Sequence, residues 1–206
     1  MTTTSKPVVI LGPTASGKSD TAMAVARTTN TEIVVCDAMQ VYRGMDIGTA
    51  KPTMQDRSDV PHHCVDLVEA TARFTVSDYQ VAARAAVTDI TSRGANALVV
   101  AGTGLYLTAL IDDLEFPGEF PEARREIEGE RHVDVLYRRL EELDPLAASR
   151  IEPTNRRRIE RALEVTIGSG KPFSSFGPGT GAYPDNGVTQ IGILWRREVL
   201  AERVEA

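Results

Sequence analysis

Residues 8–19 read VVILGPTASGKS. The apolar start is typical of a buried strand, and the remainder matches the spacing G-x-x-x-x-G-K-[ST] of a loop that binds phosphate and leads into a helix. Gly12 and Gly17 let the backbone wrap around a phosphate with its N–H groups pointing inward. A helix that begins near Lys18 adds the positive end of its dipole. This stretch therefore predicts a strand, a loop and a helix that together bind at least two linked phosphates.

The residues expected to contact those phosphates are the eight of the loop itself, namely Gly12, Pro13, Thr14, Ala15, Ser16, Gly17, Lys18 and Ser19. Lys18 supplies a mobile positive charge, and Ser19 supplies a hydroxyl suited to Mg²⁺, the cofactor that we expect. The motif leaves the reaction open, because a kinase, a nucleotide-driven switch and a transferase that releases pyrophosphate could all use it.

Strand and helix patterns alternate through the first half of the chain. The patterns predict strands at 8–11, 32–36 and 97–101, and helices at 18–28, from Ser77 to a terminating Gly94, and at 105–111. Short, continuously apolar strands are typical of a parallel sheet covered by helices on both faces. We therefore expect an α/β fold, with a parallel sheet of the phosphate-loop NTPase type flanked by helices.

The character of the sequence changes after about residue 111, where a Pro/Gly break precedes charged helical segments. We expect three parts: a phosphate-loop α/β core at 1–113, a helical insert at 114–152, and a return to the core at 153–206. The last part is predicted to hold an arginine-rich helix at 154–167 with Thr154 as its N-cap, a loop at 174–187, a strand at 188–195 and a helix from Arg197. That final helix lacks a stop signal, so we expect a chain that continues beyond it.

The composition is that of an ordinary globular protein, with 206 residues, 42% hydrophobic, 25% charged and a formal net charge of −6. The acidic balance gives no global signal for nucleic acid, so any such binding requires a local basic patch. Two cysteines, Cys36 and Cys64, argue against a disulfide framework or a zinc cluster. The sequence shows neither an apolar run of about 18 residues nor a signal peptide. We expect a cytoplasmic protein with no membrane partner.

Asp37 follows the predicted second strand, at the end where doubly wound sheets bind their ligands. An acid there suits either support of Mg²⁺ or general-base catalysis, and the local sequence favours neither. The segment at 38–52, AMQVYRGMDIGTAKP, is too long for a simple connector and too apolar for disorder, so it predicts a loop that grips a substrate. The small residues at 101–104 after the third strand fit close approach of a ligand or a plain tight turn.

Four arginines lie within residues 156–161, on a predicted helix of an otherwise acidic chain. A solvated charged face and contact with phosphate or nucleic acid are equally good interpretations of this run, although arginine favours the second.

His62 and His63 precede Cys64, but adjacent residues of an extended segment point to opposite faces. A structural or hydrogen-bonding role is therefore preferred over a metal site.

Four segments together resemble the tRNA dimethylallyltransferases, also called tRNA isopentenyltransferases: residues 12–19, 37–52, 101–107 and 155–165. The resemblance covers nearly the whole chain in order. The GTAKP ending of the second segment and the arginine-rich helix separate the chain from the related adenylate isopentenyltransferases. Family members are longer, with further C-terminal helices, and the helical insert here is a few residues short.

The resemblance implies transfer of a dimethylallyl group from dimethylallyl diphosphate to N6 of the adenosine just 3′ of a tRNA anticodon. We expect the protein to be a monomer. It implies that the loop grips the diphosphate and that Asp37, Lys18 and Ser19 are catalytic. The residues that it places on the tRNA are Asp37, Ala38, Met39, Gln40, Thr103, Arg124, Arg157, Arg158, Ile159, Glu160 and Arg161. A small-molecule or nucleotide kinase is the main alternative, and an RNA-binding module without catalysis is another.

Overall fold

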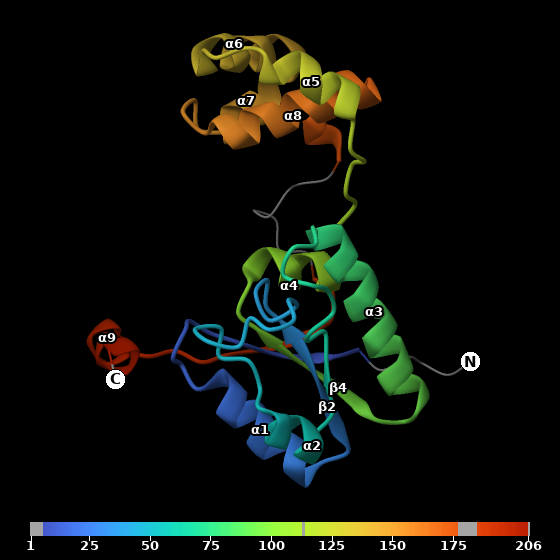
Figure 1. Cartoon of the computed structure of the whole chain (residues 1–206), viewed down its shortest axis with the longest axis vertical. Coiled ribbons are helices and arrows are strands. Elements are labelled where there is room, and N and C mark those ends of the chain that lie inside the picture. The colour runs from blue at the N-terminus through green and yellow to red at the C-terminus, as the bar shows by residue number, and fades with distance from the viewer. Residues whose placement is uncertain (1–5, 113, 177–184, 206) are drawn as a thin grey trace. The chain divides into compact units, whose positions relative to one another are not determined.

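The computed structural model describes residues 6–112, 114–176 and 185–205, and it divides into two compact units (Figure 1). The first unit comprises the described residues up to 112 together with those from 185 onward. The second unit is formed by the described residues from 114 to 176. Each unit has its own apolar core, as expected of compact domains, and each is described by itself below.

The first unit is built on a parallel sheet of five strands in the order β3-β2-β4-β1-β5. The strands are β1 at Val8–Leu11, β2 at Thr31–Cys36, β3 at His62–His63, β4 at Asn96–Ala101 and β5 at Thr189–Gly192. The expected parallel α/β sheet is therefore confirmed. Because β4 lies between β1 and β2, the carboxyl ends of these three strands are side by side, and the loops that follow them meet at one edge.

Helices cover both faces of this sheet, with α3 on one side and α1 and α2 on the other (Figure 1). The helices of this unit are α1 at Lys18–Thr28, α2 at Met54–Asp59, α3 at Val76–Ser92, α4 at Gly104–Ile111 and α9 at Arg197–Glu205. Successive strand residues point to opposite faces, so Val9 packs into the core with α3 while Ile10 packs into the core with α1. As predicted, Gly94 follows α3 in the left-handed region, with φ +74°.

The second unit is a helical bundle. Its elements are α5 at Pro121–Glu128, α6 at Val133–Leu143, α7 at Pro145–Arg150, α8 at Arg156–Ser169 and the short 3₁₀ helix η1 at Phe173–Ser175. Ile127, Leu140, Ile159 and Leu163 are almost completely buried at its centre. Asp144 ties the end of the bundle together, because its carboxylate accepts hydrogen bonds from the backbone N–H groups of Ala147 and Ser174.

The arginine-rich helix α8 differs from prediction in its place and in its cap. The sequence placed residues from 153 onward back with the α/β core, whereas α8 lies in the helical unit. The reason is its apolar face, where Ile159 and Leu163 are buried against α5 and α6. Asn155, not Thr154, is the N-cap, since its side chain accepts a hydrogen bond from the N–H of Arg158. The strand expected at 188–195 is shorter, and part of the loop expected at 174–187 falls outside the described residues.

An ion-pair cluster around the buried Glu32 joins strands and helix near the start of β2. The Glu32 carboxylate accepts hydrogen bonds from Arg93 at Oε1 (2.5 Å) and at Oε2 (3.0 Å), and Nε2 of His63 lies 2.6 Å from the same Oε2. His63 thus makes a hydrogen-bonding contact of the kind preferred for it, and Nδ1 of His62 lies 2.7 Å from the carbonyl oxygen of Val60. Hydrogen bonds from Arg93 lower the pKa of Glu32 to about 2.

This shift predicts a stability contribution that depends on pH. The folded pKa of Glu32 lies below the ordinary value of 4.5, so the contribution is complete above pH 4.5 and is lost as the pH falls toward 2. We expect Glu32→Gln to lower the free energy of unfolding by about 2 kcal/mol at pH 7, and by much less near pH 3. Urea unfolding at both pH values measures this, with the exposed ion-pair residue Glu69→Gln as the control. If Glu32→Gln lowered the free energy of unfolding equally at both pH values, the lowered pKa of Glu32 would be contradicted.

Candidate active site

The phosphate loop joins β1 to α1 and has the compact geometry that its glycines predicted. Ala15 and Gly17 both adopt left-handed backbone conformations, with φ +61° and +88°. A Cβ on Gly12 would lie 2.8 Å from Oγ of Ser16 and 2.9 Å from the carbonyl oxygen of Ile193, so only glycine fits there. The loop is closed further by a hydrogen bond from the N–H of Ser16 to the carbonyl of Pro13 at 3.2 Å.

The start of α1 leaves donors available for an anion. Gly17 is the N-cap and has no side chain to cap the helix, so the first N–H groups of the helix lack a side-chain partner. Oγ of Ser16 is buried without a hydrogen-bond partner among the described residues. A phosphate oxygen would satisfy both kinds of donor at once, which supports the predicted phosphate site.

Lys18 and Ser19 occupy the first turn of α1. Nζ of Lys18 donates to the carbonyl of Pro13 at 2.8 Å, so the side chain folds back over the loop. Burial lowers the pKa of Lys18, and the negative charge of Asp37 offsets part of that shift, which places the two side chains in one electrostatic environment. The Ser19 side chain is exposed, and its hydroxyl has no hydrogen bond within the part of the chain that the structure describes.

Asp37 lies directly after β2 and is held in a fixed orientation. Its Oδ1 accepts hydrogen bonds from the N–H groups of Met39 at 2.8 Å and Gln40 at 3.2 Å. Oδ2 has no hydrogen-bond partner among the described residues and lies 3.0 Å from the position of a Cβ on Gly102. One carboxylate oxygen is therefore used to orient the group, and the other is free to act on a ligand.

The segment after β4 completes this edge of the sheet. The N–H groups of Gly102 and Thr103 both donate to the carbonyl of Cys36, at 2.9 and 3.1 Å. The hydroxyl of Thr103 accepts a hydrogen bond from the N–H of Ala38 at 3.1 Å. The small residues after β4 thus bind the backbone on either side of Asp37, and the structure brings together the phosphate loop, Asp37 and Thr103 as predicted.

The long loop after Asp37 is folded around Lys51, the lysine of the GTAKP ending, whose burial the sequence analysis did not predict. The side chain of Lys51 is only 2% exposed, and its Nζ contacts the carboxylates of Asp46 and Asp66 and the carbonyl of Tyr42, each within 2.8 Å. Gln40, a predicted tRNA contact, is also buried, and its side-chain amide donates to the carbonyls of residues 49 and 50. Of the candidates in this loop, Met39 presents an exposed side chain.

The arginines of α8, of which Arg157, Arg158 and Arg161 are predicted tRNA contacts, separate into two groups. Arg156 and Arg161 are used inside the helical unit: Arg156 binds Glu160 and two backbone carbonyls, and Arg161 binds the buried Glu164 and the carbonyls of residues 117 and 118. Ile159 is completely buried, so its side chain is part of the core. Arg157 and Arg158 are exposed and make no ion pair within the described part of the chain.

The remaining candidate, Arg124 on α5, pairs with Glu128 at 2.8 Å and lies 3.9 Å from Glu164. Glu164 is buried and also accepts a hydrogen bond from the N–H of Phe120. Arg124 is still about half exposed, so a ligand could reach it, but it has protein partners that Arg157 and Arg158 lack among the described residues. Arg157 and Arg158 are therefore the predicted arginine contacts that are exposed and have no ion-pair partner among the described residues.

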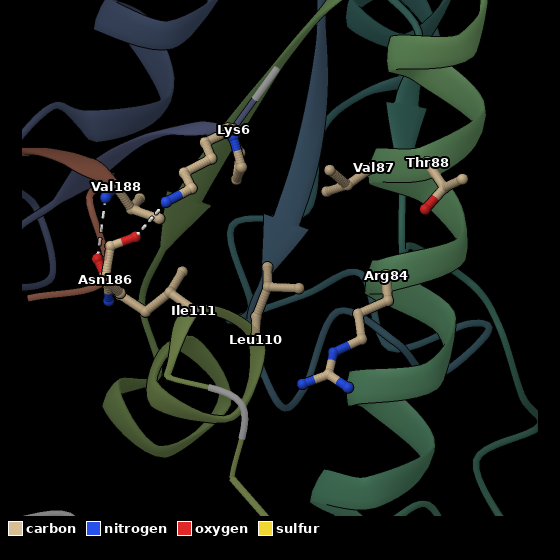
Figure 2. A pocket seen from close by; sticks show the side chains of 9 residues that line it. Lys6, Arg84, Val87, Thr88, Leu110, Ile111, Asn186 and Val188 are labelled. Carbon is tan, nitrogen blue, oxygen red and sulfur yellow. Dashed lines mark hydrogen bonds between the residues drawn. The ribbon is translucent and has the colours of Figure 1, made fainter. Parts of the chain in front are cut away.

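A cavity of about 320 Å³ lies away from this edge, between α3, α4 and the residues that precede β1 (Figure 2). Lys6, Val87, Leu110 and Asn186 are among its lining residues, and Nζ of Lys6 donates to the carbonyl of Asn186 at 2.8 Å. The phosphate loop, Asp37, Gly102 and Thr103 are not among its lining residues. The cavity is therefore separate from the candidate active site.

Comparison with known families gives two matches. The chain matches the family described as "IPP transferase" over residues 40–206 and the family described as "Isopentenyl transferase" over residues 6–67. A tRNA dimethylallyltransferase of Paenarthrobacter aurescens is 46% identical over 203 residues, which cover 97% of this chain and 65% of the relative. The chain thus spans about two thirds of the length of that relative.

Solved structures agree with the family matches. A full-length tRNA isopentenylpyrophosphate transferase of Bacillus halodurans is 38% identical, with a TM-score of 0.61, and the match covers 97% of this chain and 63% of that one. A eukaryotic dimethylallyltransferase, seen in crystallographic snapshots acting on tRNA, is 27% identical with a TM-score of 0.84. That match covers 98% of this chain and 51% of the eukaryotic one. The fold is that of these enzymes.

Proposed function

Because this chain belongs to the IPP transferase family, we propose that it transfers a dimethylallyl group from dimethylallyl diphosphate to N6 of the adenosine 3′-adjacent to the anticodon of a tRNA. The observation that carries the proposal is the edge where the phosphate loop lies beside the strand end that bears Asp37. One oxygen of Asp37 is held by backbone N–H groups and the other is free, beside a loop with unsatisfied donors. A base next to a diphosphate site is the arrangement that prenyl transfer to an amine requires.

The donor diphosphate would bind in the loop from Gly12 to Ser19. The hydroxyl of Ser16, the free N–H groups at the start of α1 and the Nζ of Lys18 would bind its oxygens, and Lys18 would leave the carbonyl of Pro13 to do so. The site also fits Mg²⁺, which binds with few protein ligands plus substrate phosphates. The unpaired hydroxyl of Ser19, beside the loop, would be its protein ligand. When bound, the ion would neutralise charge that develops on the leaving diphosphate.

The reaction is a displacement at the allylic carbon. N6 of adenosine forms a bond to C1 of the dimethylallyl group while the bond from C1 to the diphosphate oxygen breaks, and diphosphate leaves with the electron pair. The amine lone pair is delocalised into the purine, so N6 is a weak nucleophile. The free Oδ2 of Asp37 would accept a hydrogen bond from N6, orient it and take its proton as the new bond forms. The adenine must leave its stack to reach this edge, at a cost of a few kcal/mol.

Recognition of the tRNA would use the exposed arginines of α8 together with Met39 and the backbone around Ala38. Guanidinium groups suit stacking on unpaired bases and contact with phosphate.

We further propose that the protein acts as a monomer in the cytoplasm. No helix among the described residues is long and apolar enough to span a membrane.

We predict that replacing Arg157 and Arg158 together with alanine weakens tRNA binding by about tenfold and reduces the salt slope of binding by about one for each phosphate that these arginines neutralise. They have no ion-pair partner among the described residues, so the change removes charge without breaking the bundle. Binding titrations over a range of salt concentrations measure both quantities. Arg138→Ala is the control, because Arg138 is an exposed arginine on α6 of the same unit. An unchanged salt slope in the double variant would argue against RNA contact.

The activity itself is tested in a chimera, defined as the P. aurescens relative in which the matched region is replaced by this chain. The chimera supplies the rest of the relative's length while every proposed site residue comes from this chain. It is incubated with tRNA, Mg²⁺ and labelled dimethylallyl diphosphate, and a parallel sample receives ATP labelled on its γ-phosphate. Labelled tRNA in the first sample supports the proposal, and phosphate transfer in the second would favour a kinase.

A further inference from the structure

We propose that Trp195 and Arg203 are positioning residues that hold the phosphate loop in its anion-binding conformation. The inference rests on the proposed function, because it assumes that the loop binds a diphosphate. Both residues come from the segment after β5, 179 and 188 positions along the chain from the loop residues that they contact, and both belong to the same unit as the loop. The loop motif alone gives no sign of them.

The two side chains bind successive carbonyls of the loop. Nε1 of Trp195 donates to the carbonyl of Ser16 at 2.9 Å, and Nε of Arg203 donates to the carbonyl of Ala15 at 2.8 Å. The guanidinium of Arg203 also stacks 4.8 Å from the centre of the Trp195 ring, so each side chain helps to fix the other.

The backbone of the same segment is anchored beside the loop. The N–H of Ile193 donates to the carbonyl of Leu11 at 2.8 Å, and the carbonyl of Ile193 lies against Gly12. Side chains and backbone of one short segment therefore both meet the loop or the residue before it. The segment is thus part of the phosphate site and not merely a neighbour of it.

The direction of these hydrogen bonds explains what they do. In a planar trans peptide the C=O and the N–H point in opposite directions, so fixing a carbonyl fixes the N–H of the next residue. The carbonyl of Ser16 is held toward Trp195, which turns the N–H of Gly17 to the other side, and that N–H makes no hydrogen bond among the described residues. The carbonyl of Ala15 is held in the same way although Ala15 has an unfavourable left-handed conformation. The two side chains thus stabilise a strained backbone that presents a free donor.

Arg203 adds charge to this positioning effect. Its Nε is used by Ala15, and its Nη2 lies 3.8 Å from the position that a Cβ on Gly17 would occupy. Arg203 forms no ion pair with a carboxylate within the described part of the chain, so its charge remains available to an anion at the loop. Trp195 carries no charge, and comparison of the two residues therefore separates positioning from electrostatic attraction.

The test uses the 206-residue chain and inorganic pyrophosphate with Mg²⁺, measured by isothermal titration calorimetry. We expect Trp195→Phe to weaken binding about fivefold to tenfold with an unchanged salt dependence, because it removes one hydrogen bond and no charge. Arg203→Gln should weaken binding by more than about tenfold and reduce the salt dependence, and Arg203→Lys should recover part of the affinity. The control is Arg196→Gln, because Arg196 is an exposed arginine of the same segment whose side chain makes no hydrogen bond or ion pair among the described residues.

A second readout follows the backbone directly. In amide NMR spectra, Trp195→Phe should shift the Gly17 resonance and speed its hydrogen exchange, while helix α3 stays unchanged. If the unaltered chain fails to bind pyrophosphate, the phosphate site of the proposed function is wrong. If the unaltered chain binds and both Trp195→Phe and Arg203→Gln bind equally well with an unchanged Gly17 resonance, the positioning role is overturned and the proposed function stands. Should Trp195→Phe not fold, Arg203→Gln and its lysine rescue decide the question by themselves.

Discussion

Asp37→Asn should reduce transfer of the dimethylallyl group in the chimera by about 10³-fold, within the range typical of removing a general base. Asparagine keeps an oxygen that can accept from the N–H groups of Met39 and Gln40, so the loop should retain its fold. The variant lacks the free carboxylate oxygen that would take the proton from N6. Single-turnover assays with saturating tRNA and donor measure the chemical step, and the binding constants of both substrates should change less than about threefold.

The matched control for this substitution is Asp59→Asn, which removes a partly exposed carboxylate of α2 that pairs with Arg27. It should leave the single-turnover rate within about twofold of the unaltered chimera. A rate for Asp37→Asn that is close to that of the control would exclude the general-base role. A large drop in tRNA affinity with an unchanged single-turnover rate would assign Asp37 to binding instead.

Lys18→Met should lower the transfer rate by about 10²-fold to 10³-fold and weaken binding of pyrophosphate to the 206-residue chain. In the structure the ammonium is held at the carbonyl of Pro13, beside the loop and in the field of Asp37, from which it can move onto a diphosphate. Its charge would count most in the transition state, when the leaving diphosphate gains negative charge. The effect on the rate should therefore exceed the effect on donor affinity.

Calorimetry with pyrophosphate and single-turnover transfer together separate these two effects for Lys18. Lys171→Met serves as the control, because Lys171 is an exposed lysine of the helical unit. Unchanged pyrophosphate binding together with an unchanged rate would remove Lys18 from the site. Equal reductions in affinity and in rate would mean that Lys18 holds the donor without favouring the transition state.

The phosphate loop and the sheet around it could be predicted because their signals are local. A buried apolar run, two glycines at fixed spacing and a following helix determine the strand, the loop and α1. The meeting of Asp37 and Thr103 with the loop also followed from the sequence, since residues after parallel strands gather at one edge. The strand order β2-β4-β1 in the structure realises that expectation.

The place of α8 could not be read from its arginines. The charge pattern drew attention to residues 156–161, but the buried Ile159 and Leu163 decide which unit the helix joins. Arg161 illustrates the difficulty, because it donates to the carbonyls of Pro117 and Gly118, which lie 44 and 43 positions earlier in the chain. Interactions of that range, like those of Trp195 and Arg203 with the phosphate loop, depend on tertiary structure and leave no local pattern.

The proposed function is tested most simply by locating the label after the chimera has acted on tRNA with labelled dimethylallyl diphosphate and Mg²⁺. The tRNA is digested to nucleosides, and the labelled nucleoside and its position in the chain are identified. We predict label on N6 of the adenosine 3′ to the anticodon, with one diphosphate released for each group transferred. Unlabelled tRNA from a chimera that binds both tRNA and donor, while the intact P. aurescens relative labels its tRNA in parallel, would contradict this prediction.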